Sequence, residues 1–144
     1  MPHITQTAWH MEGANIVIDS RAYFRGRASG QQNNCLIDTL RQSLDLVANM
    51  TWVRSQLRRR FSHGPAAVTE SNFLTLEHHW RATIELLFEA DESGKPKLSS
   101  DTFTIICVDL IYRDNGEVVG LGPRKLHIAR EGTNHFVPLF RQRR

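Results

Sequence analysis

The sequence predicts a single α+β domain, spanning residues 1–144, in which helices of the first half pack on a small, mostly antiparallel sheet formed by the second half. Three observations support this prediction. Apolar residues recur at helical spacing between residues 36 and 90. Segment 102–112 is β-branched and apolar nearly throughout, and several short strand-like segments follow it. A run of helices followed by a run of strands is typical of the α+β class.

The first half contains one short strand, at residues 15–18, and three helical segments. A polar loop over residues 25–34 leads into the first helix at Cys35, whose apolar residues follow a helical repeat. The second helix is expected over residues 51–61, and a longer amphipathic region, undivided or divided, over residues 69–90. The repeat of the first helix comprises Leu36, Ile37, Leu40, Leu44 and Val47.

The second half is predicted to be strands. Segment 102–112 has no polar face, which is typical of a central strand covered on both sides. Asp114-Asn115-Gly116 is a hairpin turn signal and is followed by the strand-like segments 118–119, 125–129 and 135–140. Residues 131–134 form a tight connection between the last two.

Composition excludes several classes of protein. The chain is 40% hydrophobic with a formal charge of +3, and no apolar run approaches the ~20 residues of a membrane span. Its first residues lack the pattern of a signal peptide. No Cys/His spacing matches a zinc site, so no metal is expected.

Arginines cluster at residues 54–60 and 141–144, but no aromatic residues are interleaved with them; a solvated helix face and a tail are favoured over nucleic-acid binding.

The two cysteines have different surroundings. Cys107 lies in the apolar segment 104–108, where cysteine packs as a small hydrophobic residue. Cys35 follows a polar loop and begins a helix, where free backbone N–H groups and the helix dipole favour a thiolate. A working thiol there implies a reducing site of action, and two cysteines in a chain of this size do not indicate a disulfide framework.

A nucleophile needs a base, and His135 is the candidate. It follows a tight turn and begins a strand, and a histidine there could accept the thiol proton and later protonate a leaving amine. The alternative is that Cys35 is an unreactive residue at the start of a helix. His78 and His79 are adjacent and would diverge on a helix, and His127 is expected to pack within a strand.

Three separated segments resemble the ovarian-tumour (OTU) family of cysteine proteases, most of which are deubiquitinases. The family's nucleophile motif Asp-Gly-Asn-Cys-Leu-Phe is matched by Gln32-Asn33-Asn34-Cys35-Leu36-Ile37 in its Asn, Cys and Leu. A tryptophan followed by Glu-Leu on a helix is matched by Trp80 and Glu85-Leu86, which we expect to support the fold only. The final histidine-aromatic pair is matched by His135-Phe136.

The resemblance implies a papain-like (OTU-type) fold with Cys35 as nucleophile and His135 as general base. It further implies an oxyanion hole formed by backbone N–H groups of Gln32 and Cys35, ubiquitin or a ubiquitin-like protein as substrate, and no cofactor. The acid or amide that often follows the histidine by two residues is replaced by Val137. Asp19 is the preferred third residue; Asp109 and a bare Cys–His dyad are alternatives.

Other functions stay open. A papain-like thiol enzyme can also act as a deamidase, transglutaminase or acyltransferase, because fold does not fix function. A binding module that uses the arginine clusters is the non-catalytic alternative. The small size suggests a bacterial effector or toxin, or a viral domain, acting in a reducing cytosol. Acidic residues suited to the basic tail of ubiquitin are Glu12, Glu70, Asp91 and Glu92.

Overall fold

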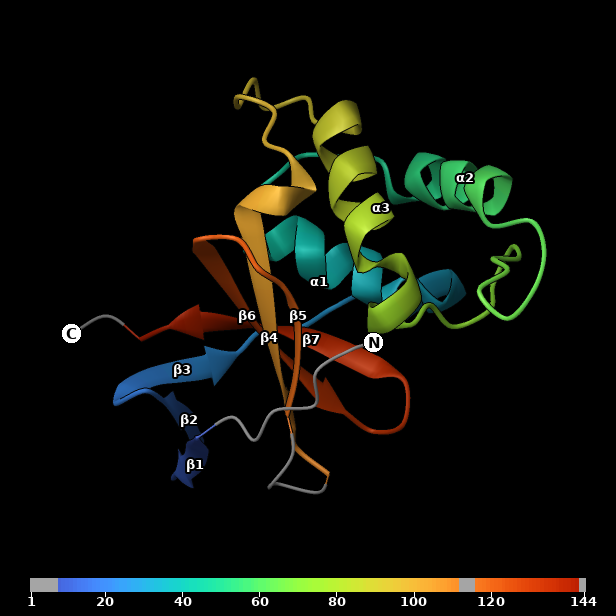
Figure 1. The fold of residues 1–144 in the computed structure, drawn as a ribbon. Coiled ribbons are helices and arrows are strands. Elements are labelled where there is room, and N and C mark those ends of the chain that lie inside the picture. Colours follow the sequence, from blue (N-terminus) through green and yellow to red (C-terminus); the bar gives the residue numbers. More distant parts are fainter. Residues whose placement is uncertain (1–7, 112–115, 143–144) are drawn as a thin grey trace.

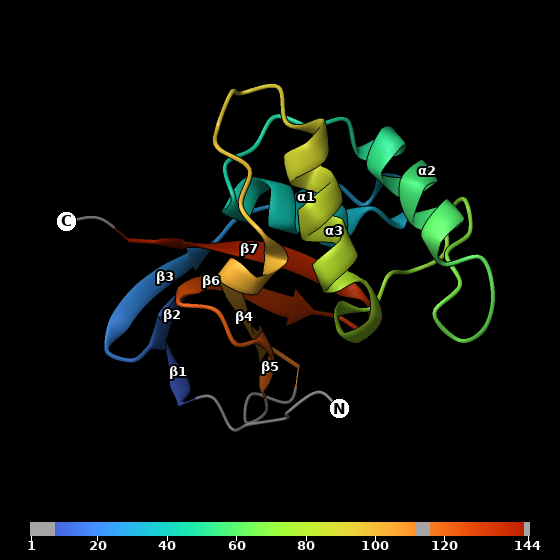
Figure 2. The same ribbon diagram turned by 45° about the horizontal axis from the view of Figure 1, so that its top comes forward.

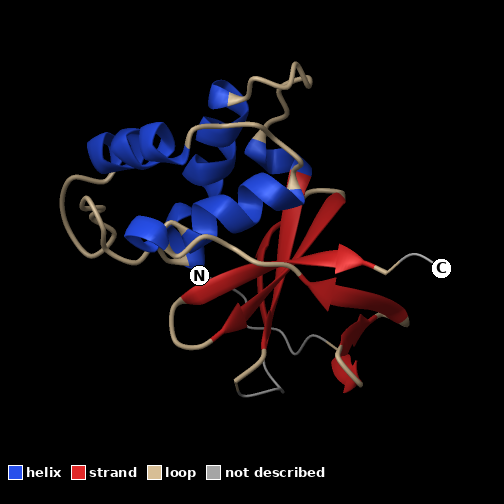
Figure 3. Ribbon diagram, turned by 180° about the vertical axis from the view of Figure 1, so that it is seen from behind, coloured by secondary structure: helices blue, strands red, loops and turns tan. Residues whose placement is uncertain are grey.

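The protein folds into a layer of helices that lies on a strongly curled mixed sheet. The computed structural model describes residues 8–111 and 116–142. Figures 1 and 2 show the three helices together on one side, and Figure 3, seen from behind, shows the sheet curling away beneath them. This arrangement segregates helices from strands, so the predicted α+β class is confirmed.

The sheet has seven strands in the order β1-β2-β3-β7-β6-β4-β5. Among the strands of the described residues, β4 and β6 alone pair in parallel, and the other pairs are antiparallel. The strands are β1 (Trp9–Glu12), β2 (Asn15–Ile18), β3 (Arg21–Arg25), β4 (Phe103–Asp109), β5 (Gly116–Gly120), β6 (Arg124–Glu131) and β7 (His135–Arg141). The long strand β4 lies between β6 and β5 and is buried over most of its length, as its apolar sequence predicts.

The helices are α1 (Cys35–Ser43), α2 (Met50–Arg60) and α3 (Leu76–Ala90). Asn49 caps α2 by accepting a hydrogen bond from the N–H of Trp52, and Thr75 caps α3 by accepting one from the N–H of His78. The cap at Thr75 explains why α3 begins after residues 69–75, which sequence periodicity included in the helical region.

Helix α1 ends four residues before Val47 because the chain turns into the left-handed region at Asp45, where φ is 54°. The N–H of Asp45 donates to the carbonyl of Gln42, and the N–H of Leu46 donates to that of Arg41. These two bonds form a Schellman motif, which satisfies the last carbonyls of a helix and stops it.

Two apolar clusters lie on opposite faces of the sheet. The larger lies under the helices and includes Leu36, Ile84, Ile105 and Phe136. The smaller lies on the other face, where β1 to β3 curl over the sheet; it comprises Ile16, Ile18, Tyr23, Val108, Ala129, Val137 and Leu139. Alternate residues of β7 therefore reach opposite clusters, as strand geometry requires.

The prediction that helices precede the sheet is wrong, because three strands come before α1. Strand β2 coincides with the predicted segment, but β1 and β3 were missed. Their sequences, Trp9-His10-Met11-Glu12 and Arg21-Ala22-Tyr23-Phe24-Arg25, leave at least half of their side chains exposed or half-buried. Such strands lack an apolar pattern and are recognised only through the strands that pair with them.

Residues 114 and 115 of the predicted hairpin turn lie outside the described residues. Within the described part of the chain, no helix is long and apolar enough to cross a membrane. Among the same residues, no group of three or more His, Cys, Asp or Glu side chains could hold a metal ion.

Candidate functional site

Cys35 is the first residue of α1 and is 4% exposed. The turn before it, Gln31–Asn33, is a single turn of 3₁₀ helix in which Gln32 and Asn33 both have positive φ, at 54° and 57°. Two successive non-glycine residues in the left-handed region are uncommon, and such strained backbone is concentrated at functional sites. The tolerance of asparagine for this region fits Asn33; Gln32 has no such preference.

The side chain of Arg54, which comes from α2, makes hydrogen bonds to this loop. Its guanidinium is buried, with 3% of the residue exposed, and donates from Nε to Asn34 Oδ1 and from Nη2 to the carbonyl of Asn33. Further bonds run to the carbonyls of Thr69 and Asn72, each at 3.0 Å. Burial lowers the pKa of Arg54, and electrostatic interaction with Cys35 raises it. A buried cation therefore lies close to the sulphur.

The bond from Arg54 also changes how α1 begins. Asn34 occupies the N-cap position but makes no capping bond, because its side-chain oxygen accepts from Arg54 instead. Within the described residues no hydrogen bond uses the N–H of Gln32 or of Cys35, whereas those of Asn33 and Asn34 donate to Gly30 and Gln31. The first turn of α1 is thus left with free donors beside the thiol.

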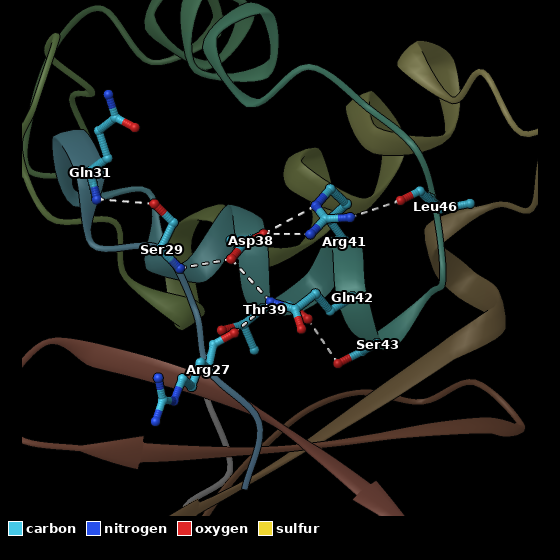
Figure 4. Close-up of polar contacts among 9 residues, drawn as sticks. All are labelled: Arg27, Ser29, Gln31, Asp38, Thr39, Arg41, Gln42, Ser43 and Leu46. Carbon is cyan, nitrogen blue, oxygen red and sulfur yellow. Dashed lines mark hydrogen bonds and ion pairs between the residues drawn. The ribbon is translucent and has the colours of Figure 1, made fainter.

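Asp38 fixes the other side of the loop. Its buried carboxylate accepts from the backbone N–H of Ser29 at 2.7 Å, from Arg41 at 2.8 Å and from Gln42 at 3.0 Å (Figure 4). Gln42 also donates to the carbonyl of Arg27. The segment leading to Cys35 is therefore tied to α1 itself, so the loop and Cys35 are held as one unit.

The structure brings Cys35 against the β6–β7 turn. Sγ of Cys35 donates to the carbonyl oxygen of Asn134 at 3.3 Å, across 99 residues of sequence. His135, the next residue, begins β7. Within the described residues Sγ makes no hydrogen bond to the His135 ring. Cys35 and His135 are therefore brought together through the backbone of Asn134, and the thiol donates its hydrogen bond to the Asn134 carbonyl.

Glu131 contacts His135 and was missed by the sequence analysis. Its Oε1 atom lies 3.7 Å from Nε2 of His135, and its Oε2 atom accepts from Arg25 at 3.1 Å. Glu131 ends β6 directly opposite His135, so the two side chains share one face of the sheet. The tight turn over residues 132–134 was a signal for this pairing, since a short hairpin fixes its register.

Asp19 does not lie near His135, which corrects its assignment as the orienting acid. Asp19 precedes β3, whose Tyr23 pairs with Arg141 at the far end of β7. In Figure 1 the β2–β3 turn lies at the left and the β6–β7 turn at the right. With ~3.3 Å per strand residue, the length of β7 separates them. Asp19 instead interacts electrostatically with His127.

Asp109 ends β4, and its Oδ1 atom accepts from the N–H of Ile111 at 2.9 Å, a bond that caps the strand. Cys107 is buried in the same strand, as expected for a packing residue, and burial raises the pKa of its thiol to about 12. His127 packs against Tyr23 with 4.7 Å between ring centroids. None of the contacts described for Asp109, Cys107 and His127 involves Cys35.

His79 is a structural histidine of α3. Its Nδ1 atom accepts from the N–H of Thr75 at 2.9 Å, and its Nε2 atom lies 2.7 Å from the carbonyl of Ala66. These partners require a neutral ring with the proton on Nε2. Burial is the main cause that lowers the pKa of His79.

The basic cluster of α2 divides into two kinds of residue. Arg58 and Arg59 are exposed, and Arg60 pairs with Glu85 at 3.1 Å, which agrees with a solvated helix face. Arg54, in contrast, makes hydrogen bonds to the loop that precedes Cys35. Trp80 and Leu86 are buried in the core, in agreement with their expected role in the fold.

Comparison with known proteins adds nothing to this geometry: the chain matches no family model, no curated protein and no solved structure.

Proposed function

We propose that the protein is a cysteine isopeptidase with a papain-like (OTU-type) arrangement, in which Cys35 is the nucleophile and His135 the general base. The observation that carries the proposal is the contact of 3.3 Å between Sγ of Cys35 and the carbonyl of Asn134. It joins the start of a helix to the start of a distant strand, as a cysteine–histidine pair requires.

The surroundings of Cys35 supply the remaining chemistry. The buried Arg54 and the uncapped first turn of α1 both favour negative charge at the sulphur. Attack of the thiolate on an isopeptide carbonyl breaks its C–O double bond and gives an oxyanion. The free N–H groups of Gln32 and Cys35 are the donors for this oxyanion. Protonated His135 then delivers its proton to the leaving lysine amine, which leaves a thioester.

Hydrolysis of the thioester completes the cycle. His135 removes a proton from water, the hydroxide adds to the thioester carbonyl, and Cys35 leaves as a thiolate. In this scheme the imidazole of His135, whose Nε2 atom lies 3.7 Å from Glu131, turns toward the sulphur to accept its proton. The ring and the thiol would close to hydrogen-bond distance when substrate binds, since catalytic bonds are often long in unliganded enzymes.

The substrate class rests on the resemblance to deubiquitinases. The C-terminal tail of ubiquitin is basic, so acidic groups beside the site favour it. Glu131 is one such group, and Glu70 is exposed beside Ser71, whose carbonyl accepts from the side chain of Asn33 in the nucleophile loop. Asp91 is not available for this role, because it accepts from the N–H groups of Val47 and Ser93.

The test is to incubate the protein with ubiquitin that carries a C-terminal electrophile and to record the intact mass. We expect one ubiquitin adduct, absent in Cys35→Ala and slowed in His135→Ala. Cys107→Ala is the matched control, and it should form the adduct at the wild-type rate.

Absence of the adduct would contradict a ubiquitin substrate. A small electrophile then decides the chemistry: rapid alkylation of Cys35 that depends on His135 would retain a thiol enzyme acting on another acyl group, such as a deamidase or acyltransferase. Equal and slow alkylation of both cysteines would overturn the catalytic assignment.

A further inference from the structure

Two adjoining cavities lie where β6 begins, at the end of the sheet remote from Cys35. One has a volume of about 600 Å³ and lies against the ends of α1 and α3; its lining includes Lys95, Arg124 and Lys125. The other has a volume of about 480 Å³, and Arg21, Lys125 and Arg141 line it. Ser43, Lys125 and Leu126 line both cavities, and the two together are called the basic groove.

The lining of the basic groove carries positive charge only. Five lysine and arginine side chains contribute, and no carboxylate does: Arg21, Lys95, Arg124, Lys125 and Arg141. Lys95 is paired with Asp45. The other four make no ion pair with any residue that the structure describes, whereas arginines elsewhere pair with Asp38, Glu85, Asp101 and Glu131. Unpaired cations around a hollow attract anions, because low-dielectric walls concentrate their field.

Strand register accounts for the convergence of three of these side chains, those of Arg21, Lys125 and Arg141. Tyr23 of β3 pairs with Arg141 of β7, so the two share one face. Arg21 lies two residues before Tyr23 and points to that same face. His127 packs its ring on Tyr23, and Lys125 lies two residues before it. Three strands therefore place their cations over one surface, on rigid elements rather than loops.

The charges are close enough to affect one another. Burial is the main cause that lowers the pKa of His127; Lys125 and Arg21 lower it further, while Asp19 raises it. The last effect identifies Asp19 as the acidic group that faces His127. It does not line either cavity.

We propose that the basic groove binds a small, multiply charged phosphate compound. Each cavity has the volume of a small-molecule site, and several unpaired cations suit several phosphate groups better than one. The groove offers few exposed aromatic faces on which nucleic-acid bases could stack, because Tyr23, Phe88 and Phe103 are buried and Phe140 is half-buried. Its concave form also disfavours a flat membrane surface.

The test measures binding of inorganic triphosphate by calorimetry, with orthophosphate for comparison. We expect triphosphate to bind at least about tenfold more tightly, since it contacts several cations at once. Lys125→Met, which removes the cation shared by both cavities, should weaken binding about tenfold, and Lys125→Arg should restore it. Arg59→Met removes an exposed cation of α2 and should leave the affinity unchanged. Thermal unfolding without ligand checks that each variant is folded.

A second measurement, the pKa of His127 followed by NMR, reports on the groove itself. Bound triphosphate places negative charge near His127 and should raise the pKa of its imidazole, which NMR can follow. Binding that is equally weakened by Lys125→Met and Arg59→Met would overturn the proposal, because it would reflect overall charge alone. So would the absence of triphosphate binding.

Two further arms separate the sources of phosphate. A nucleoside triphosphate and a soluble phosphorylated lipid headgroup should both compete with triphosphate if the site reads phosphate groups. Binding only to vesicles, or only to single-stranded RNA, with no effect of triphosphate would contradict a small-molecule site. Cys35→Ala should retain full binding, so the outcome does not depend on the proposed isopeptidase activity.

Discussion

Asn34 and Arg54 form the contact that prepares the start of α1: the Asn34 side chain accepts from Nε of Arg54 and is thereby removed from its capping position. A polar residue at an N-cap normally satisfies one of the free N–H groups of its helix. Here a buried guanidinium occupies it, and Cys35 keeps uncapped donors and a cation nearby. The loop is therefore organised for negative charge at some cost in helix stability.

Arg54→Met should both unfold the protein more easily and slow the reaction of Cys35. The substitution leaves the acceptors of Asn34, Thr69 and Asn72 without their donor in the interior, at a cost of about 3 kcal/mol in the free energy of unfolding. Urea denaturation measures this cost. Arg58→Met, an exposed neighbour on α2, should change stability by less than about 0.5 kcal/mol.

The two effects of Arg54 can be separated in conditions where the variant is folded. There, alkylation of Cys35 should be slower than in the wild type, because the cation near the thiol is absent. An Arg54→Met protein that loses stability but alkylates at the wild-type rate would restrict Arg54 to a structural role.

The two cysteines should react at different rates with iodoacetamide. Cys107 is buried in β4 and its pKa is raised to about 12, so almost none of it is thiolate near neutral pH. Cys35 is also buried but lies beside a cation and free N–H groups. Peptide mass mapping after brief labelling should find the adduct on Cys35. A bulky maleimide should be slowed more by folding than iodoacetamide is, relative to each reagent's rate in urea, because only 4% of the residue is exposed.

Labelling in urea is the control for this experiment. Both cysteines should then react at similar rates, since the environment that distinguishes them is lost. Preferential labelling of Cys107 in the folded protein would contradict the assignment of the nucleophile.

Glu131→Gln should lower kcat/KM about tenfold if Glu131 orients His135. The substitution keeps the shape of the side chain but removes the negative charge that lies 3.7 Å from Nε2. A positioning carboxylate stabilises the imidazolium, so the loss should fall on kcat rather than KM. Turnover of a fluorogenic ubiquitin substrate measures both constants.

Asp19→Asn is the matched control for the carboxylate. It tests the residue that the sequence favoured, which the structure places at the other end of β7. Activity should be unchanged. Arg25→Gln frees the second oxygen of Glu131 and should produce a smaller loss than Glu131→Gln. A larger loss for Asp19→Asn than for Glu131→Gln would contradict this arrangement.

The difference between the sequence-based and structural views of the site has a physical origin. The positions of Cys35 at a helix start and of His135 at a strand start were predictable, because both follow from local sequence patterns. Glu131 and Asp19 depend on which strands pair and in what register, which the separate segments do not specify. Arg54 resembled its exposed neighbours Arg58 and Arg59, since its role depends on a loop that approaches it from outside the helix.

The fold shows the same limit. The amphipathic repeats of the helices and the apolar run of β4 were visible in the sequence, because residues that become buried are apolar and follow the geometry of each element. Strands β1 and β3 carry polar residues and arginines and gain their structure from β2 and β7. The parallel pairing of β4 with β6 likewise depends on the whole sheet.

His79 should make stability depend on pH. Its pKa is lowered in the folded protein, so the unfolded chain binds more protons as the pH falls below about 6.5. The stabilisation is therefore fully present above that pH and is lost as the pH falls toward the lowered value.

His79→Gln should decrease the free energy of unfolding at pH 7 by about 1–2 kcal/mol, through the weakened bonds to Ala66 and Thr75, and should flatten its decline toward pH 5. Urea titrations at several pH values measure this slope. His127→Gln should flatten this slope in part, because burial lowers the pKa of His127 as well. A slope that persists in the double variant His79→Gln/His127→Gln would assign the acid sensitivity to other groups.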